Sequence, residues 1–187
     1  MTAAMTMNSA AAEPMFQSTH AALVFAFNFS AQQYDQPAMA KLMGQAIGSG
    51  KGLVGTAGAG QAGMVLAAVE RLDPIHRAAI YARFAPKFEE CPCCGGDKPT
   101  ENWKHAVECL AAWAVPSGIS HMRSRRMLIA KFFGVRGVEI KTMSNDVGLN
   151  RNSLAERYRE IGARLKKAED HAQVKLDDEF KQRGLVG

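Results

Sequence analysis

Residues Met143–Phe180 read MSNDVGLNRNSLAERYREIGARLKKAEDHAQVKLDDEF, and most of this stretch has the apolar spacing of one long helix. Its apolar residues recur at alternating steps of four and three, which places them on one helical stripe: Leu154, Tyr158, Ile161, Leu165, Ala168 and Ala172. An unbroken helix over residues 151–180 would be about 45 Å long at a rise of 1.5 Å per residue. Because Lys175 interrupts the stripe, we expect it to pack on helices of the same chain as a monomer, with a homodimer as the alternative.

The start of the same stretch fits a helix-turn-helix pattern. Met143–Val147 would end the first helix, with Ser144 as the small residue where the two helices cross. Gly148 suits the left-handed turn, Leu149 is the apolar residue that follows it, and Asn150 is a residue that caps helices. The sequence therefore predicts two helices joined by a tight turn, the second one beginning just after Asn150. A packed helix pair without a ligand is the alternative.

Several polar or small residues at the start of the second helix lie off the apolar stripe and are expected to face outward: Arg151, Asn152, Ser153, Ala155 and Glu156. In a DNA major groove, arginine can pair with guanine, asparagine with adenine, and glutamate can accept from cytosine. We therefore expect this helix to read the base pairs of double-stranded DNA.

The charge distribution favours the same partner. Between His121 and Lys167 there are 12 Lys or Arg residues and 4 Asp or Glu residues, whereas the rest of the chain holds 11 basic and 14 acidic residues. A basic surface of this kind neutralises DNA phosphates. The residues expected to contact phosphates are Arg123, Arg125, Arg126, Arg136, Lys141, Arg157 and Arg159. A solvated helix face without a ligand is the alternative.

Four side chains have the spacing of a zinc site, C-x2-C followed by H-x3-C: Cys91, Cys94, His105 and Cys109. The first pair lies in the turn-forming sequence CPCCGG, and the second pair lies four residues apart in a helical stretch, on one face. Three thiolates and one imidazole would complete a closed tetrahedral zinc shell, which is typical of a structural ion and not of a catalytic one. Cys93 is an alternative ligand to Cys94.

Composition and cysteine usage limit the class of protein. No apolar run approaches the roughly 20 residues that span a bilayer, so no membrane association is expected. No Lys or Arg precedes Lys41, which argues against a secretion signal. Four cysteines within 19 positions favour reduced thiols and a bound metal, so we expect a cytoplasmic protein.

We expect an all-α fold in three parts. Residues 1–36 are predicted to be a flexible N-terminal arm, with docking of residues 21–29 on the body as an alternative. Residues 37–118 are predicted to be a helical region with the zinc site, and 119–183 the basic helix-turn-helix region. Residues 48–60 are rich in glycine and are expected to be a connector. They do not match the phosphate-binding pattern G-x4-G-K-[ST], because Gly52 follows Lys51.

Taken in order along the chain, these parts resemble a known family. Leu72–Ala79 (LDPIHRAA), the compact Cys/His site, the basic helix and the Asn150–Ser153 (NRNS) helix opening are similar to the Q-type late-gene antiterminators of tailed bacteriophages and prophages. The helix-turn-helix with its preceding basic helix also resembles the promoter-reading region of bacterial sigma factors. The resemblance covers roughly residues 60–180.

The resemblance implies a DNA-binding transcription regulator that loads onto RNA polymerase in the host bacterial cytoplasm and carries it through terminators. A repressor or activator, and a DNA-packaging protein of the small-terminase type, are the alternatives. We do not expect an enzyme such as a zinc hydrolase or nuclease, because the predicted zinc shell is closed and no carboxylate is obviously placed as a general base.

Overall fold

The computed structural model describes residues 14–35, 55–115 and 118–187, and in this part of the chain the fold is mostly helical. The helices are α1 (Thr19–Asp35), α3 (Gly55–Glu70), α4 (Pro74–Phe84), α5 (Glu101–Ala114), α6 (Met122–Phe132), α7 (Ile140–Val147) and α8 (Arg151–Gln182). Two short strands, β1 (Phe88–Glu90) and β2 (Asp97–Pro99), form an antiparallel hairpin between α4 and α5. The expected helical fold is confirmed, and the hairpin is an element that the sequence analysis did not predict.

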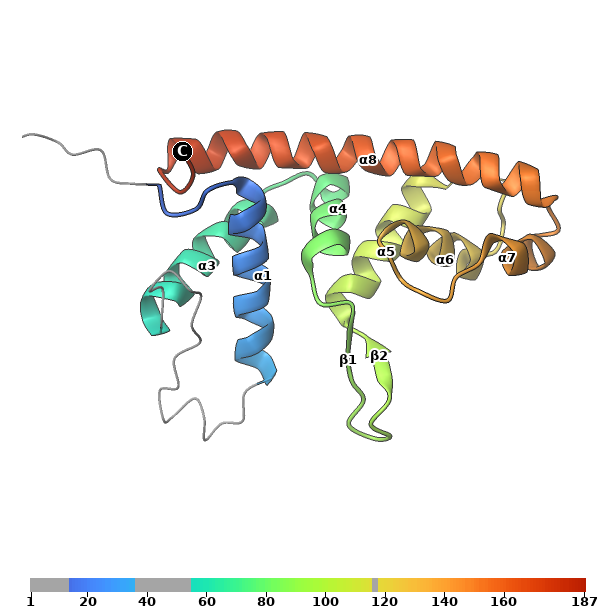
Figure 1. The fold of residues 1–187 in the computed structure, drawn as a ribbon, viewed down its shortest axis with the longest axis horizontal. Helices are drawn as coiled ribbons and strands as arrows, with labels where there is room; N and C mark the ends of the chain where they lie inside the picture. The colour runs from blue at the N-terminus through green and yellow to red at the C-terminus, as the bar shows by residue number, and fades with distance from the viewer. Residues whose placement is uncertain (1–13, 36–54, 116–117) are drawn as a thin grey trace, which may run out of the picture.

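Helix α8 runs the length of the molecule, with the other helices on one side of it (Figure 1). Its 32 residues contact α1, α3, α4, α5 and α7. The predicted stripe is buried at Leu154, Ile161, Leu165, Ala168 and Ala172, with Tyr158 half-buried. It continues beyond exposed Lys175 to buried Leu176 and Phe180. The chain's own helices therefore cover the stripe, as expected for intramolecular packing.

The buried side chains form two hydrophobic clusters along α8. The first cluster lies between α1, α3 and the second part of α8, and the second lies between α5, α6, α7 and the first part of α8. Helix α4 contributes Ile80 to the first cluster and Ala78 and Ala82 to the second. Helices α5 and α6 lie on either side of the predicted boundary at 118/119, and their buried residues share the second cluster.

A buried ion pair connects α4 to α8. Two guanidinium nitrogens of Arg83, Nε and Nη2, donate to the Glu169 carboxylate at 2.8 Å, and Glu169 is almost fully buried. The same guanidinium lies over the rings of Phe133 and Phe132, with 5.0 and 5.6 Å to their centroids. Since a buried carboxylate without its partner is strongly destabilising, this pair fixes the position of α8 against α4.

The expectation of a flexible N-terminal arm is wrong for residues 14–35. Leu23, Ala26 and Phe27 of α1 are buried, and the Phe16 N–H donates to the Leu185 carbonyl at 2.8 Å. Helix α1 packs against α3, α4 and α8, so it is apolar on several sides and lacks the one-sided periodicity by which a surface helix is recognised. Residues 1–13 and 36 of the predicted arm lie outside the described residues.

The predicted glycine-rich connector overlaps α3. Residues 55–60 belong to this helix, although glycine is a poor helix former. The buried Val65, Ala68 and Val69 further along α3 pack in the first cluster, and this burial outweighs the low helical propensity of the first turns. Residues 48–54 of the connector lie outside the described residues.

Replacing Leu23 tests whether α1 is part of the core. Leu23→Ala should lower the free energy of unfolding by about 3 kcal/mol, because it leaves a cavity where a fully buried leucine was. The adjacent Val24 is 38% exposed, so Val24→Ala should change it by less than about 1 kcal/mol. Urea denaturation of both variants measures the difference, and equally small effects would mean that α1 is a loosely attached arm.

Candidate functional site

The β1–β2 hairpin presents a six-residue loop, Cys91–Gly96, at its tip. Two backbone hydrogen bonds close the loop: the Cys91 N–H donates to the Gly96 carbonyl at 2.7 Å and the Gly95 N–H to the Cys91 carbonyl at 2.9 Å. Gly95 has a φ of 67°, which glycine adopts without strain. The tight loop brings the sulfurs of Cys91, Cys93 and Cys94 within 4.8 Å of one another.

Hydrogen bonds within the Cys91–Gly96 loop, called the cysteine turn below, favour ionisation of one of its thiols. The Cys91 and Cys93 sulfurs are 2.9 Å apart. Hydrogen bonding to the Cys93 thiol, with further bonds from the Cys93 backbone and the Cys94 thiol, lowers the pKa of Cys91 to about 7. The same Cys91–Cys93 bond raises the pKa of Cys93. Thiolate sulfur is the form that binds metal ions, so the turn has suitable chemistry for a soft cation.

The structure brings two of the four predicted zinc ligands together and leaves the other two elsewhere. Cys91 and Cys94 lie in the cysteine turn, with Cys93 beside them. His105 and Cys109 face a cavity of about 230 Å³ that residues of α4 and α5 line. Cys93, which the sequence analysis offered as an alternative to Cys94, is in the cluster alongside it.

A tertiary contact sets which way α5 faces. The Trp103 ring is 5.8 Å from the ring of Phe88 on β1, and its Nε1–H donates to the Ala82 carbonyl at 3.3 Å. Trp103 therefore faces the hairpin and the end of α4. His105 follows two residues later, so it points about 200° away around the helix at 100° per residue. The i,i+4 spacing of His105 and Cys109 is retained, but neither side chain joins the three cysteines whose sulfurs lie within 4.8 Å of one another.

The turn between α7 and α8 has the geometry that its sequence predicts. Gly148 ends α7 in the left-handed conformation, with φ 68° and ψ 22°. The Asn150 side-chain oxygen accepts from the Asn152 N–H at 2.9 Å and caps α8. Buried Met143 and Leu154 hold the two helices to the second hydrophobic cluster. The cap and the packing of these two side chains together fix the position at which α8 begins.

The predicted base-reading residues lie on the outer side of α8. Arg151, Asn152, Ser153 and Glu156 are exposed, and Ala155 is half-buried. No acidic residue occurs in the first turn of α8, so Arg151 adds its charge to the positive end of the helix dipole. This end of the helix favours a negatively charged ligand.

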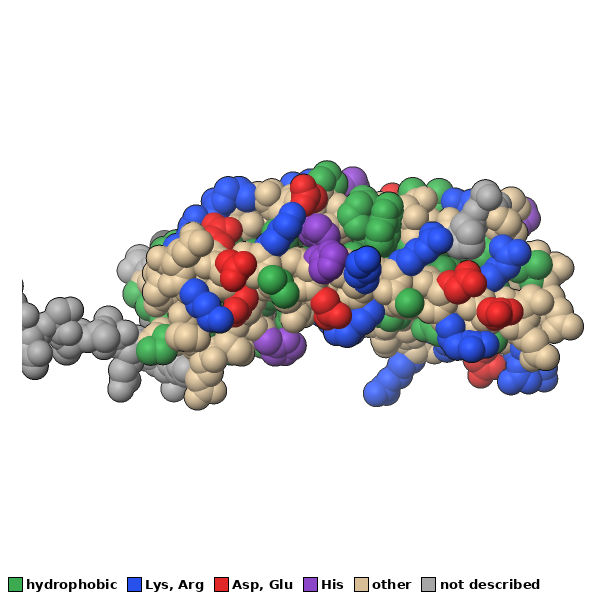
Figure 2. All heavy atoms as spheres, turned by 90° about the horizontal axis from the view of Figure 1, so that it is seen from above, with side chains coloured by type: hydrophobic (Ala, Val, Ile, Leu, Met, Phe, Trp, Pro, Cys, Tyr) green, Lys and Arg blue, Asp and Glu red, His purple; other side chains and the backbone are tan. Residues whose placement is uncertain are grey.

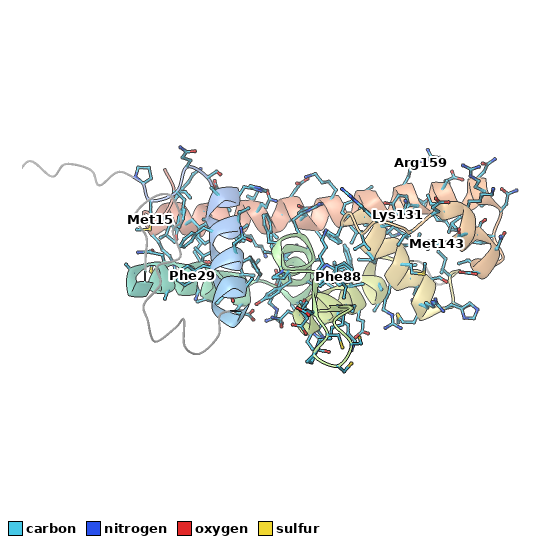
Figure 3. The ribbon with its side chains drawn as sticks, turned by 60° about the horizontal axis from the view of Figure 1, so that its bottom comes forward. Met15, Phe29, Phe88, Lys131, Met143 and Arg159 are labelled. Atoms are coloured by element: carbon cyan, nitrogen blue, oxygen red, sulfur yellow. The ribbon has the colours of Figure 1, made fainter. Side chains whose placement is uncertain are left out.

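Four of the predicted phosphate-binding side chains are exposed, and within the described residues none of them forms an ion pair: Arg123, Arg136, Lys141 and Arg159. Arg159 projects from α8 away from the other helices (Figure 3). The surface at this end of the molecule carries several Lys and Arg side chains with acidic ones between them (Figure 2).

Three other predicted phosphate-binding residues contact the protein itself. The Arg125 Nε donates to the Ile119 carbonyl at 2.5 Å, and Arg126 pairs with Glu108 at 2.9 Å. The half-buried Arg157 lies directly against Gly118, where a side chain would collide with its guanidinium group. These contacts join α6 to α5 and to the segment that follows it, and α8 to the same segment, so the three residues are less available to a ligand than predicted.

Comparison with known proteins does not place this chain in a family: no known family matches it, and no curated protein sequence matches it significantly. Its function is therefore argued from the residues and their geometry. None of the helices in the described part of the chain combines the length and the apolar character needed to cross a bilayer.

Replacing Asn150 tests the cap that begins α8. Asn150→Ala should lower the free energy of unfolding by about 1 kcal/mol, because the Asn152 N–H loses its acceptor. Asn150→Asp keeps a side-chain oxygen in place and should have almost no effect. Chemical denaturation compares the two variants, and a loss of stability in Asn150→Asp equal to that in Asn150→Ala would contradict the capping role.

Proposed function

We propose that this chain is a sequence-specific DNA-binding protein that places the first turns of α8 in the major groove of double-stranded DNA. The observation that supports this most strongly is the contrast between the two sides of α8 at its start. Leu154 is buried in the core, while Asn152 and Glu156 are exposed about 160° around the helix from it, and Arg151 is exposed at the first position of the helix. A helix anchored on one side and polar on the other can approach base edges without losing its packing.

The exposed groups have complementary chemistry to base pairs. Arg151 can donate two hydrogen bonds to guanine, Asn152 can pair with adenine, and Glu156 can accept from cytosine. The major groove, about 12 Å wide, admits a single helix. Arg123, Arg136, Lys141 and Arg159 are the phosphate contacts in this proposal, and such contacts orient a protein on the duplex without selecting its sequence.

The charge along α8 supports one orientation on DNA. Residues 151–167 contain six basic and two acidic residues, whereas residues 168–182 contain two basic and five acidic residues. DNA phosphates attract the first part and repel the second. We therefore place the first part of α8 and the neighbouring α7 on the duplex, with the first hydrophobic cluster away from it.

For the biological role we propose transcription antitermination in a bacterial cytoplasm, on the resemblance to the Q-type phage proteins. In that role the chain would bind DNA near a promoter and then travel with RNA polymerase. A repressor or activator, and a DNA-packaging protein, use the same DNA-binding surface and are the alternatives. We propose a binding protein and not an enzyme, and a monomer before DNA binding, because the chain's own helices cover the apolar stripe of α8.

A bound zinc ion with a structural role is also part of the proposal. The cysteine turn supports it, because three sulfurs converge there within the range of a single ion. Both hydrophobic clusters are built without these three cysteines, so the ion would order the hairpin tip and would not hold the helices together.

Base reading by α8 predicts different effects for two charge-removing variants. On a DNA site selected from a random duplex library, Arg151→Ala should lose about 1–3 kcal/mol of binding free energy and tolerate other bases at one position. Lys141→Ala should weaken selected and unrelated duplexes alike, and reduce the slope of log K against log salt by about 0.9. Lys181→Ala removes the same charge from the far end of α8 and serves as the control. Unchanged base preference after both Arg151 and Asn152 are replaced would show that α8 is not the reading helix.

The antitermination role predicts read-through of a terminator. On a template with the selected site, a promoter and a downstream terminator, the protein should increase full-length transcript made by bacterial RNA polymerase. Arg151→Ala should reduce this increase. Less initiation without read-through would indicate a repressor, and more initiation an activator. A stable ring of subunits without an effect on transcription would indicate a packaging protein.

A further inference from the structure

We propose that Cys91, Cys93 and Cys94 together bind one zinc ion through three thiolates, and that the fourth coordination position is open at the tip of the hairpin. The inference rests on the metal binding proposed above and is independent of DNA binding. It replaces the closed ligand set predicted from spacing with an exposed set in which Cys93 is a ligand.

The sulfur positions fit a single ion. A tetrahedral zinc ion with Zn–S bonds of about 2.3 Å holds its sulfurs roughly 3.8 Å apart. The Cys91 and Cys93 sulfurs are 2.9 Å apart, and all three sulfurs lie within 4.8 Å of one another. Small side-chain rotations can therefore seat the ion. Binding releases the protons of the thiols that are not already ionised.

The backbone holds the three cysteines in place without help from a metal. The two hydrogen bonds that close the loop leave its six residues little freedom, and Glu89 pairs with Lys98 across the strands at 2.9 Å. At the base of the hairpin the Thr100 hydroxyl donates to the Pro86 carbonyl at 2.6 Å. A site organised in advance binds an ion with less loss of conformational entropy than a flexible loop does.

The two ligands predicted on α5 are not placed to join this site. They line the cavity between α4 and α5, where the guanidinium-bearing Arg77 is also part of the wall. Arg77 pairs there with the Glu70 carboxylate at 3.1 Å, so the one acidic group in the lining already has a cation beside it. Moving His105 and Cys109 towards the hairpin would require α5 to rotate and would bring Trp103 out of its contact with Phe88.

The surroundings of the fourth position define its ligand class. Cys93 and Cys94 are exposed, so solvent reaches the ion. The Glu90 carboxylate lies beside the loop, with its Oε1 3.7 Å from the position that a Cβ on Gly95 would take. Water or a carboxylate oxygen can therefore complete the shell. Three sulfur ligands select soft ions, which suits Zn²⁺ and its analogues Co²⁺ and Cd²⁺.

Cobalt titration of the full chain tests the ligand set. The reduced protein is stripped of metal with a chelator and titrated with Co²⁺, which gives sulfur-to-cobalt charge-transfer absorption in proportion to the number of thiolate ligands. We expect one equivalent to bind and Zn²⁺ to displace it. Cys93→Ser should lower the charge-transfer absorption per bound cobalt by about a third, because one of three metal–sulfur bonds is lost. His105→Ala and Cys109→Ser should leave it unchanged.

Two results would overturn the proposal. Absorption that falls in Cys109→Ser and stays unchanged in Cys93→Ser would assign the ion to the closed Cys/His shell. A reduced chain that binds no cobalt would remove the metal site altogether. Neither result would affect the DNA selection experiment, so failure of the metal site and failure of DNA binding are separable. Far-UV circular dichroism of each variant confirms that the helices are intact.

Discussion

The buried stripe of α8 is the interaction on which the rest of this structure depends. It passes from Leu154 in one hydrophobic cluster to Phe180 in the other, and the Arg83–Glu169 pair fixes α8 against α4 between them. Because a continuous helix transmits position along its axis, the two clusters act as one support for both ends of α8. The exposed start of the helix is held by the packing of Leu154 in the second cluster and by the cap at Asn150.

This arrangement bears on the proposed binding of DNA by the start of α8. The proposed reading residues lie on the first two turns of α8, beyond a glycine turn and a side-chain cap that fix where the helix begins. A helix that is rigid before it binds loses little conformational entropy on entering a groove. In the proposed complex the acidic second part of α8 would add direction, since DNA phosphates would repel it and attract the first part.

The features of the fold that were predictable from sequence are those that local chemistry determines. The stripe of α8, the turn at Gly148 and the cap at Asn150 depend on neighbouring residues, and the structure has all three. Helix α1 was missed because its exposed side includes apolar Val24, so no continuous polar side marks its period. The hairpin was missed because Glu89, Lys98 and Pro99 are poor strand residues, and their pairing depends on the turn and on a cross-strand ion pair.

The candidate sites also combine features that local sequence determines with features that depend on tertiary packing. The proximity of Cys91 and Cys94 follows from a six-residue turn. The position of His105 and Cys109 depends on how the contacts of Trp103 orient α5, and sequence spacing cannot reveal those contacts. Likewise, the basic character of the surface is visible in the sequence. The contacts of Arg125 with a carbonyl and of Arg126 with Glu108 exist because distant segments pack together.

Amide hydrogen exchange along α8, with and without the selected DNA duplex, tests the central claim most directly. In the free protein we expect slow exchange from Leu154 to Phe180, because the buried stripe is continuous. Added DNA should slow exchange further at residues 151–160 and in α7, and leave residues 168–182 unchanged. Rapid exchange in the middle of α8, or DNA protection confined to its acidic part, would contradict a single rigid helix that presents its first turns to DNA.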